Sequence, residues 1–160
     1  RGASGSPGEL RGDFDLTRDL GSLYANTECG IFGVLPQENR PEAVGEAIPV
    51  ARRTEVRTGK AVILANCRGD EVCAYEIEIE KLYGGSAPTR NLLLRVTDPA
   101  LIALTGGIVQ GMSGSPIVQD GKLVGAVTHV LLDDPQRGYG ILAENMLSAS
   151  GMTAQSAASA

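Results

Sequence analysis

The sequence predicts an all-β fold, and three observations support that prediction. Gly contributes 21 of the 160 residues, about 13% where ~7% is usual, and aromatic residues are scarce at 4%. Residues 72–82 alternate between Tyr75, Ile77 and Ile79 on one side and glutamates on the other, which is the period of a strand with one buried face. Short apolar runs separated by turn residues recur along the chain. Together these patterns indicate an antiparallel sandwich or barrel.

The N-terminal half contains short strands separated by loops. Residues 1–12 hold four Gly and one Pro, as a linker-like segment does, and residues 13–26 show no clear period. We expect strands over 29–35 and 61–65, with edge-like strands over 47–51 and 54–56 between them.

The C-terminal half carries clearer patterns. Asp98 as N-cap, Pro99 as first residue and Gly106 as stop predict a short helix over 99–104. Gly121 predicts a hairpin turn. We expect further strands over 72–82, 91–96, 117–118, 123–132 and 138–141, a terminal helix over 142–149, and a disordered tail over 151–160. On this interpretation, residues 13–150 are the C-terminal portion of one domain.

Composition excludes several classes of protein. The net charge of −5 argues against a surface for nucleic acid, whose phosphates need cations. Interrupted apolar stretches exclude a transmembrane helix. The chain has one His, and Cys29, Cys67 and Cys73 lack metal-ligand spacing, so we expect neither a metal site nor a cofactor. The cysteines form either one disulfide or three free thiols.

Residues 111–116, Gly-Met-Ser-Gly-Ser-Pro, are the candidate for chemistry. A serine nucleophile needs an exposed hydroxyl on a tight turn, with backbone N–H groups directed at the developing oxyanion. Gly111 and Gly114 allow such a turn around Ser113. The N–H groups of Gly111 and Ser113 would then form the oxyanion hole. The alternative is a Gly- and Ser-rich β-turn without function.

The residues after this turn favour catalysis. Pro116, Gly121 and Gly125 follow Ser113 by three, eight and twelve residues. This run, G-x-S-G-x-P followed by a glycine-containing hairpin, resembles the nucleophile region of trypsin-like serine peptidases. The resemblance implies that the returning strand borders the substrate cleft and pairs with an extended peptide. On this alignment the cleft edge consists of Thr128, His129 and Val130.

Several longer segments resemble one family, the SpoIVB (sporulation stage IV protein B) peptidases. They are residues 105–129, 133–140 and 144–147, together with 26–33 and 5–12. The resemblance implies a trypsin-like antiparallel β-barrel with short helices, incomplete because its N-terminal part is missing, and serine endopeptidase activity. It further implies a protein or peptide substrate, a membrane-associated regulator of endospore formation, and the capacity for self-cleavage.

The same resemblance implies a location. Such peptidases are secreted across the forespore membrane or anchored on its outer side, with a membrane anchor and a PDZ domain that these residues do not include. Because the chain begins with Arg rather than Met, we interpret it as a fragment or a processed form.

The general base is the missing part of this interpretation. By resemblance it is a His in a Gly-His motif upstream of residue 1, whereas His129 is the only His here. The position of His129, sixteen residues after Ser113, belongs to the substrate cleft on the trypsin-like template. We therefore expect a cleft-wall role for His129, with base catalysis as the alternative, and almost no activity from these 160 residues alone.

Two questions stay open on sequence alone. The resemblance points to Asp98 as the triad acid, but a helix N-cap explains the same residue without catalysis; Asp70 is a weaker candidate. The alternative to an endopeptidase is a non-catalytic β-barrel module that binds extended peptides by strand addition.

Overall fold

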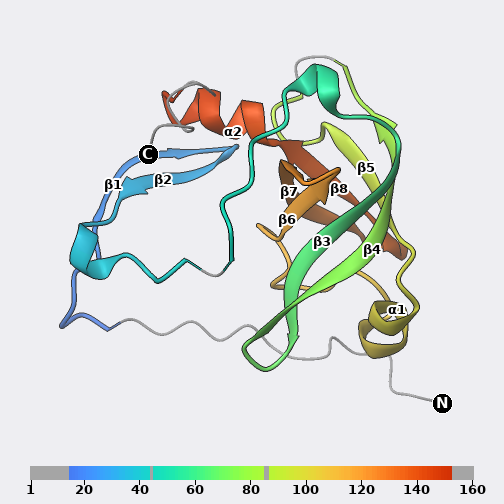
Figure 1. Ribbon diagram of the computed structural model, residues 1–160, viewed down its shortest axis with the longest axis horizontal. Coiled ribbons are helices and arrows are strands. Elements are labelled where there is room, and N and C mark those ends of the chain that lie inside the picture. Colours follow the sequence, from blue (N-terminus) through green and yellow to red (C-terminus); the bar gives the residue numbers. More distant parts are fainter. Residues whose placement is uncertain (1–14, 44, 85–86, 153–160) are drawn as a thin grey trace.

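Six antiparallel strands close into a barrel, in the order β3-β4-β5-β8-β7-β6 (Figure 1). The computed structural model describes residues 15–43, 45–84 and 87–152. The barrel strands are β3 (Gly59–Arg68), β4 (Glu71–Leu82), β5 (Leu92–Val96), β6 (Pro116–Gln119), β7 (Lys122–Leu131) and β8 (Asp134–Leu142). The prediction of a mainly antiparallel β fold is confirmed.

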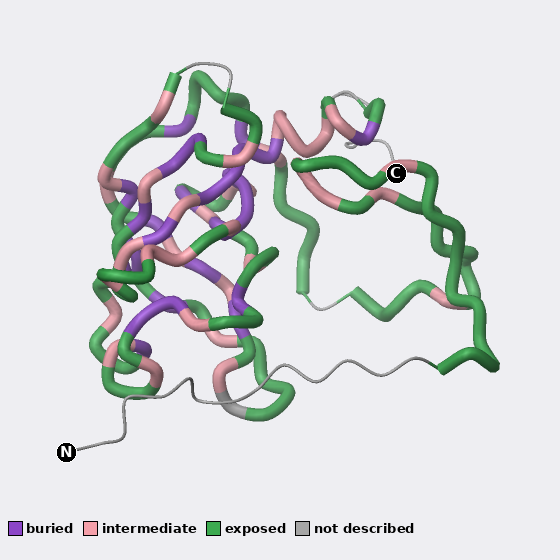
Figure 2. Tube along the Cα trace, turned by 180° about the vertical axis from the view of Figure 1, so that it is seen from behind, coloured by how far each residue is buried: buried purple, intermediate pink, exposed green. Residues whose placement is uncertain are grey.

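Alternation builds the barrel wall. Along β4, Tyr75, Ile77 and Ile79 are buried and the residues between them face solvent, as the period of two requires. Inward-facing aliphatic residues of the other strands complete the core, which Figure 2 shows inside the barrel. Fully buried side chains include Ile63, Leu92, Leu94, Val96, Ile117, Val124 and Val127.

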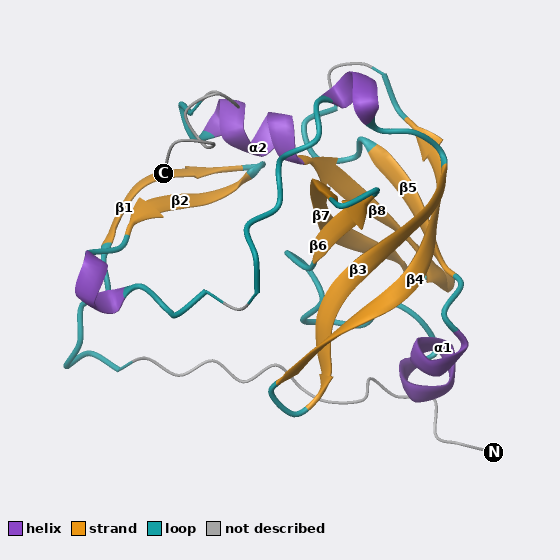
Figure 3. Ribbon diagram, viewed as in Figure 1, coloured by secondary structure: helices purple, strands orange, loops and turns teal. Residues whose placement is uncertain are grey.

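Two short helices flank the barrel (Figure 3). Helix α1 (Pro99–Thr105) begins after Asp98 and ends at Gly106, which has a φ of 79°. Helix α2 (Ala143–Ala149) follows β8 directly. Both helices lie where the sequence predicts them. Neither they nor any other helix in the described residues has the length and apolar character needed to cross a membrane.

A two-stranded hairpin lies beside the barrel rather than in it (Figures 1 and 2). It consists of β1 (Ser22–Thr27) and β2 (Gly30–Val34) and reaches α2 through the Tyr24 hydroxyl, which donates to the Ser150 carbonyl at 3.2 Å. Strand β1 was not expected. Leu23 and Tyr24 both remain more than half exposed, so no buried face imposes a period on its sequence.

The expected edge strands over 47–51 and 54–56 are corrected. Only Val50 forms a bridge, parallel to Leu123, and residues Arg53–Glu55 form a single 3-10 turn, η2. The Glu55 carboxylate accepts the Arg52 N–H at 2.8 Å, which closes the turn. A second turn, η1 (Gln37–Asn39), follows β2. Strand β8 begins at Asp134, four residues earlier than expected. The expected linker over 1–12, and most of the tail, lie outside the described residues.

The lengths of three neighbouring strands leave a gap in the barrel wall. Strand β6 has four residues, whereas its neighbours β3 and β7 have ten each. Strand β3 pairs with β6 only at Val62 and Ile63, and β7 continues past β6 after Ala126. The turn that precedes β6 therefore lies between two longer strands, and this turn contains Ser113.

Candidate active site

Ser113 lies exposed at the tip of a tight, glycine-dependent turn. Gly111 and Gly114, on either side, have φ angles of 95° and 91°, in the left-handed region that other residues rarely adopt. The Ser115 N–H donates to the Met112 carbonyl at 3.0 Å and closes the turn. The Met112 side chain is 6% exposed and anchors the turn to the core.

Two N–H groups of the turn are available to an oxyanion. In the described part of the chain, the N–H groups of Met112, Gly114 and Ser115 each donate to a backbone carbonyl, and those of Gly111 and Ser113 donate to none. These are the two groups that the sequence assigns to the oxyanion hole. An oxyanion hole requires N–H groups without an internal acceptor, because these donors must be free to bind the negative charge that develops on the substrate oxygen.

The Ser113 hydroxyl is held but not activated. Its Oγ donates to the Thr128 carbonyl at 3.0 Å. A carbonyl oxygen can hold this proton in a hydrogen bond but is too weak a base to remove it. Among the described residues, no imidazole or carboxylate bonds to Ser113 Oγ. If Ser113 is the predicted nucleophile, the described residues place no general base in contact with it.

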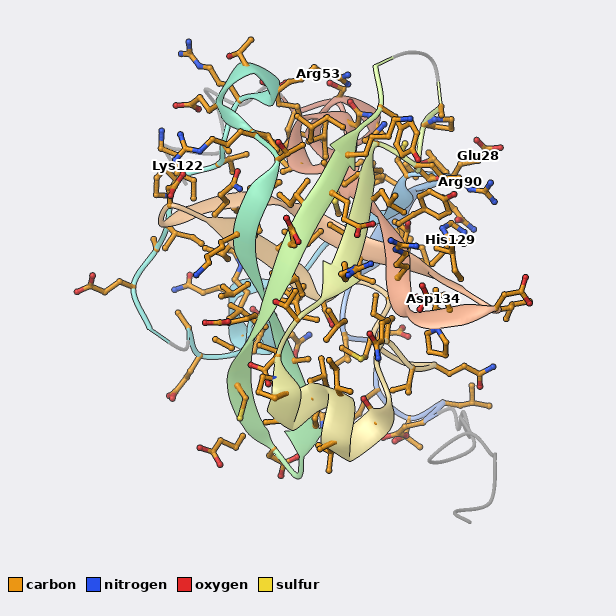
Figure 4. All side chains as sticks on the ribbon, turned by 90° about the vertical axis from the view of Figure 1, so that its right-hand side faces the viewer. Glu28, Arg53, Arg90, Lys122, His129 and Asp134 are labelled. Carbon is orange, nitrogen blue, oxygen red and sulfur yellow. The ribbon has the colours of Figure 1, made fainter. Side chains whose placement is uncertain are left out.

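His129 makes no hydrogen bond to Ser113, and Figure 4 shows it at the surface of the molecule. Val127 and His129, two residues apart on β7, do not share a face. The pairing of β7 with β8 shifts between these residues, from Val127 opposite Gly140 to His129 opposite Tyr139. Thr128 is the extra residue of this bulge, which ends the regular alternation. Val127 is buried and His129 is exposed.

The predicted cleft edge lies on the part of β7 that extends beyond its pairing with β6. The Thr128 carbonyl faces Ser113, and the Thr128 hydroxyl bonds to the carbonyls of Thr89 and Tyr139, each at 3.2 Å. The His129 carbonyl faces β8 instead: a Cβ on Gly138 would lie 2.5 Å from it. By alternation, the backbone of Val130 again faces the side of Ser113. An extended peptide could therefore pair with Thr128 and Val130.

Asp98 has the contacts of a helix cap. Its Oδ1 accepts the N–H groups of Ala100 at 2.9 Å and Leu101 at 3.0 Å, and its Oδ2 accepts that of Glu76 at 3.2 Å. These bonds, led by that of Leu101, hold the pKa of the carboxyl below its ordinary value. The capping prediction is confirmed. The role of triad acid stays a prediction, and no contact between Asp98 and Ser113 supports it in this structure.

The three cysteines are not joined by a disulfide. Cys29, Cys67 and Cys73 are free, half-buried thiols. Cys67 and Cys73 lie beside Tyr75, and burial of the phenol, with these thiols as further causes, raises the pKa of Tyr75 to about 12. In the part of the chain that the structure describes, no three His, Cys, Asp or Glu side chains gather closely enough to hold a metal ion.

A cavity of about 500 Å³ opens beside Ser113, and the sequence did not indicate it. Its walls come from the end of β3 and from the segment that leads into the turn. The lining residues are Leu64, Ala65, Asn66, Cys67, Thr105, Val109, Gln110, Gly111, Met112, Ser113 and Ser115. A cavity of similar size on the outside of β3, β4 and β6 includes no residue of the Ser113 turn.

An antiparallel six-stranded barrel with an exposed serine at this turn is the trypsin-like peptidase fold. The chain belongs to the SpoIVB peptidase S55 family, because the sequence model of this family matches residues 1–147. A comparison of the sequence with curated proteins finds no match.

Solved structures confirm the fold. The Rv3671c protease from M. tuberculosis in its active form is similar with a TM-score of 0.54 and 21% identity, over 83% of this chain and 59% of that chain. Its inactive form is similar with a TM-score of 0.52 and 19% identity, over 82% of this chain and 65% of that chain. This chain thus spans less than two thirds of the length of these structures.

Proposed function

We propose that the protein is a serine endopeptidase with Ser113 as nucleophile. The observation that supports this most is the turn itself. It exposes one hydroxyl and leaves the N–H groups of Gly111 and Ser113 unpaired next to it. Membership of a peptidase family gives independent support. A mere structural turn needs neither feature.

The geometry suggests how the reaction proceeds. An extended substrate pairs with β7 at Thr128 and Val130, which brings its scissile carbonyl over Ser113. Ser113 Oγ leaves the Thr128 carbonyl and forms a bond to the carbonyl carbon, while its proton passes to a general base. The Gly111 and Ser113 N–H groups bind the oxyanion. The base then protonates the leaving amine as the C–N bond breaks, and water hydrolyses the acyl-enzyme.

We propose that this base is a His outside residues 1–160. His129 is the only His in the sequence, and it is exposed and not bonded to Ser113. On this proposal, Asp98 caps α1. It also acts as the triad acid only if the His outside these residues forms a hydrogen bond to its carboxylate.

The proposed physiological substrate is a membrane-associated regulator in the signalling pathway of endospore formation, with self-cleavage as a second reaction. Membership of the SpoIVB peptidase family supports this choice. The corresponding location is the outer side of the forespore membrane, either secreted or membrane-anchored.

A second candidate function is peptide binding without cleavage. It is favoured by one observation, the bond from Ser113 Oγ to a carbonyl rather than to a base. A module of this kind would use the same β7 edge, and its affinity for extended peptides would be independent of the Ser113 hydroxyl.

A peptide-cleavage assay of the natural polypeptide that contains these residues distinguishes the endopeptidase from the non-catalytic peptide-binding module. We expect Ser113→Ala to abolish cleavage of a peptide library, because loss of a nucleophile typically costs on the order of 10⁶ in kcat. Ser148→Ala in α2, outside the Ser113 turn and its cavity, is the control, and we expect it to retain activity. Equal cleavage by Ser113→Ala and the parent protein would exclude this nucleophile; peptide binding without cleavage in all three would establish the second candidate.

A further inference from the structure

We propose that the cavity between β3 and the Ser113 turn binds the substrate side chain that follows the scissile bond, and that this side chain is uncharged and largely apolar. The proposal rests on the proposed peptidase function. It places the main side-chain selection on the leaving-group side of the cleft rather than on the acyl side.

The barrel topology gives Ser113 two different flanks. Ser113 lies in the gap before β6, with β7 on one flank and β3 on the other. The β7 flank offers backbone groups at Thr128 and Val130, and we assign the acyl part of the substrate to this flank. A peptide that continues across Ser113 leaves this edge and passes over the opposite flank, where the end of β3 borders the cavity.

The β7 flank has little room for a large side chain. Ile108, which is 4% exposed, packs over Gly138, the partner of Val130 in the ladder. A Cβ added to Gly138 would lie 2.7 Å from Ile108 Cδ1. The Ile108 N–H also donates to the Pro135 carbonyl at 2.8 Å, which fixes this segment against β8. Ile108 therefore occupies the space over Gly138, next to the part of β7 that contains Val130.

The β3 flank is open. Its cavity of about 500 Å³ lies in the range of volumes that hold small ligands, and Gly111 and Ser113 are among its lining residues. Leu64, Ala65, Val109 and Met112 supply apolar walls, and Asn66 and Gln110 supply uncharged polar groups. None of the lining residues carries a charge. A Lys, Arg, Asp or Glu side chain would lose water there without gaining an ionic partner.

A charge placed in the cavity tests the assignment. Asn66 is exposed, so Asn66→Asp changes the charge of the wall with almost no change in shape or fold. In the natural polypeptide, we expect it to raise cleavage of peptides with Arg or Lys after the scissile bond, relative to Glu, by roughly two- to fivefold, the effect of an exposed ion pair. Gln110→Glu, also exposed in the wall, is expected to shift the same preference. Asn26→Asp in β1, equally exposed, is the matched control and is expected to leave the profile unchanged.

The outcomes separate this inference from the proposed function. A parental preference for apolar residues after the scissile bond, shifted by both wall variants and not by Asn26→Asp, supports the inference. Ser113-dependent cleavage with no preference at that position, or with a profile that Asn66→Asp and Gln110→Glu leave unchanged, overturns it and leaves the peptidase assignment intact. Absence of any Ser113-dependent cleavage overturns both.

Discussion

The bond from Ser113 Oγ to the Thr128 carbonyl links the nucleophile to the strand that would receive substrate. In this arrangement the hydroxyl occupies an acceptor that a substrate N–H group could use. Pairing of a peptide with β7 would compete for that carbonyl and free the hydroxyl for its base. Nucleophile and cleft edge are thus coupled through one hydrogen bond.

Asp98 supports a prediction about stability. Asp98→Ala removes the acceptor of the Ala100 and Leu101 N–H groups, so we expect it to lower the free energy of unfolding by about 1 kcal/mol at pH 7. The folded state lowers the pKa of this carboxyl, so its ionised form stabilises the fold above the unfolded pKa near 4, and that contribution is lost as the pH falls through the folded pKa. Urea unfolding of the parent protein and of Asp98→Ala, at pH 7 and at pH 2.5, measures the loss of stability and its pH dependence. The same loss of unfolding free energy at both pH values would contradict a stabilising role of the ionised carboxylate.

Asp98→Asn separates the cap from the triad acid. Asn is also a good N-cap, so the variant keeps most of the stability. A triad acid replaced by Asn typically loses about 10⁴ in kcat. From the capping contacts, we expect kcat of the natural polypeptide to stay within a few-fold of the parent; a loss of thousands would restore Asp98 to the triad.

At the scale of elements, close approach of β7 and β8 makes Gly125 indispensable. A Cβ on Gly125 would lie 1.8 Å from the Ile141 carbonyl oxygen, a backbone atom that can move only if the ladder opens. We expect Gly125→Ala to destabilise the barrel by about 3 kcal/mol, at the upper end of the usual cost of overpacking. Thermal unfolding followed by circular dichroism measures this change.

Gly84→Ala is the control for the Gly125 variant. Its Cβ would meet no atom within 4 Å, and Gly84 has no positive φ, so we expect an effect within about 0.5 kcal/mol. Comparable loss of stability in both variants would show that the register of β7 and β8 is not as described.

In the molecule as a whole, the barrel is stabilised by a hydrophobic core and the β1–β2 hairpin is not. The barrel is closed and has a common core, whereas β1 and β2 pair only with each other and leave Leu23, Ile31 and Val34 mostly exposed. Isolated two-stranded sheets are marginally stable in water. We expect amide hydrogens of β1 and β2 to exchange at least tenfold faster than those of β3 and β4. Hydrogen exchange read by mass spectrometry tests this, and uniform protection would show that the hairpin unfolds only with the barrel.

Local patterns made much of this molecule predictable. The alternation of β4, the Asp98-Pro99 cap and the glycines around Ser113 act over a few residues, so the sequence alone indicates their structures. Strand β1 lacks a buried face and gave no periodic signal. The turn at Arg53–Glu55 has a backbone bond from the Glu55 N–H to the Arg52 carbonyl and a second bond from the Arg52 N–H to the Glu55 carboxylate, and the alternation of residues 54–56 does not indicate either bond. The bulge at Thr128 and the cavity at the end of β3 arise from strand lengths and register, which become visible only when the barrel closes.

Reaction of the natural polypeptide with a fluorophosphonate tests whether Ser113 is its nucleophile. Peptide mass spectrometry after labelling can distinguish Ser113 from Ser115, which shares its turn and is half-buried. We predict a single adduct, on Ser113, that is absent from Ser113→Ala and retained in Ser115→Ala. An adduct on Ser115, or no adduct on Ser113 in a preparation that cleaves peptides, would contradict the assignment.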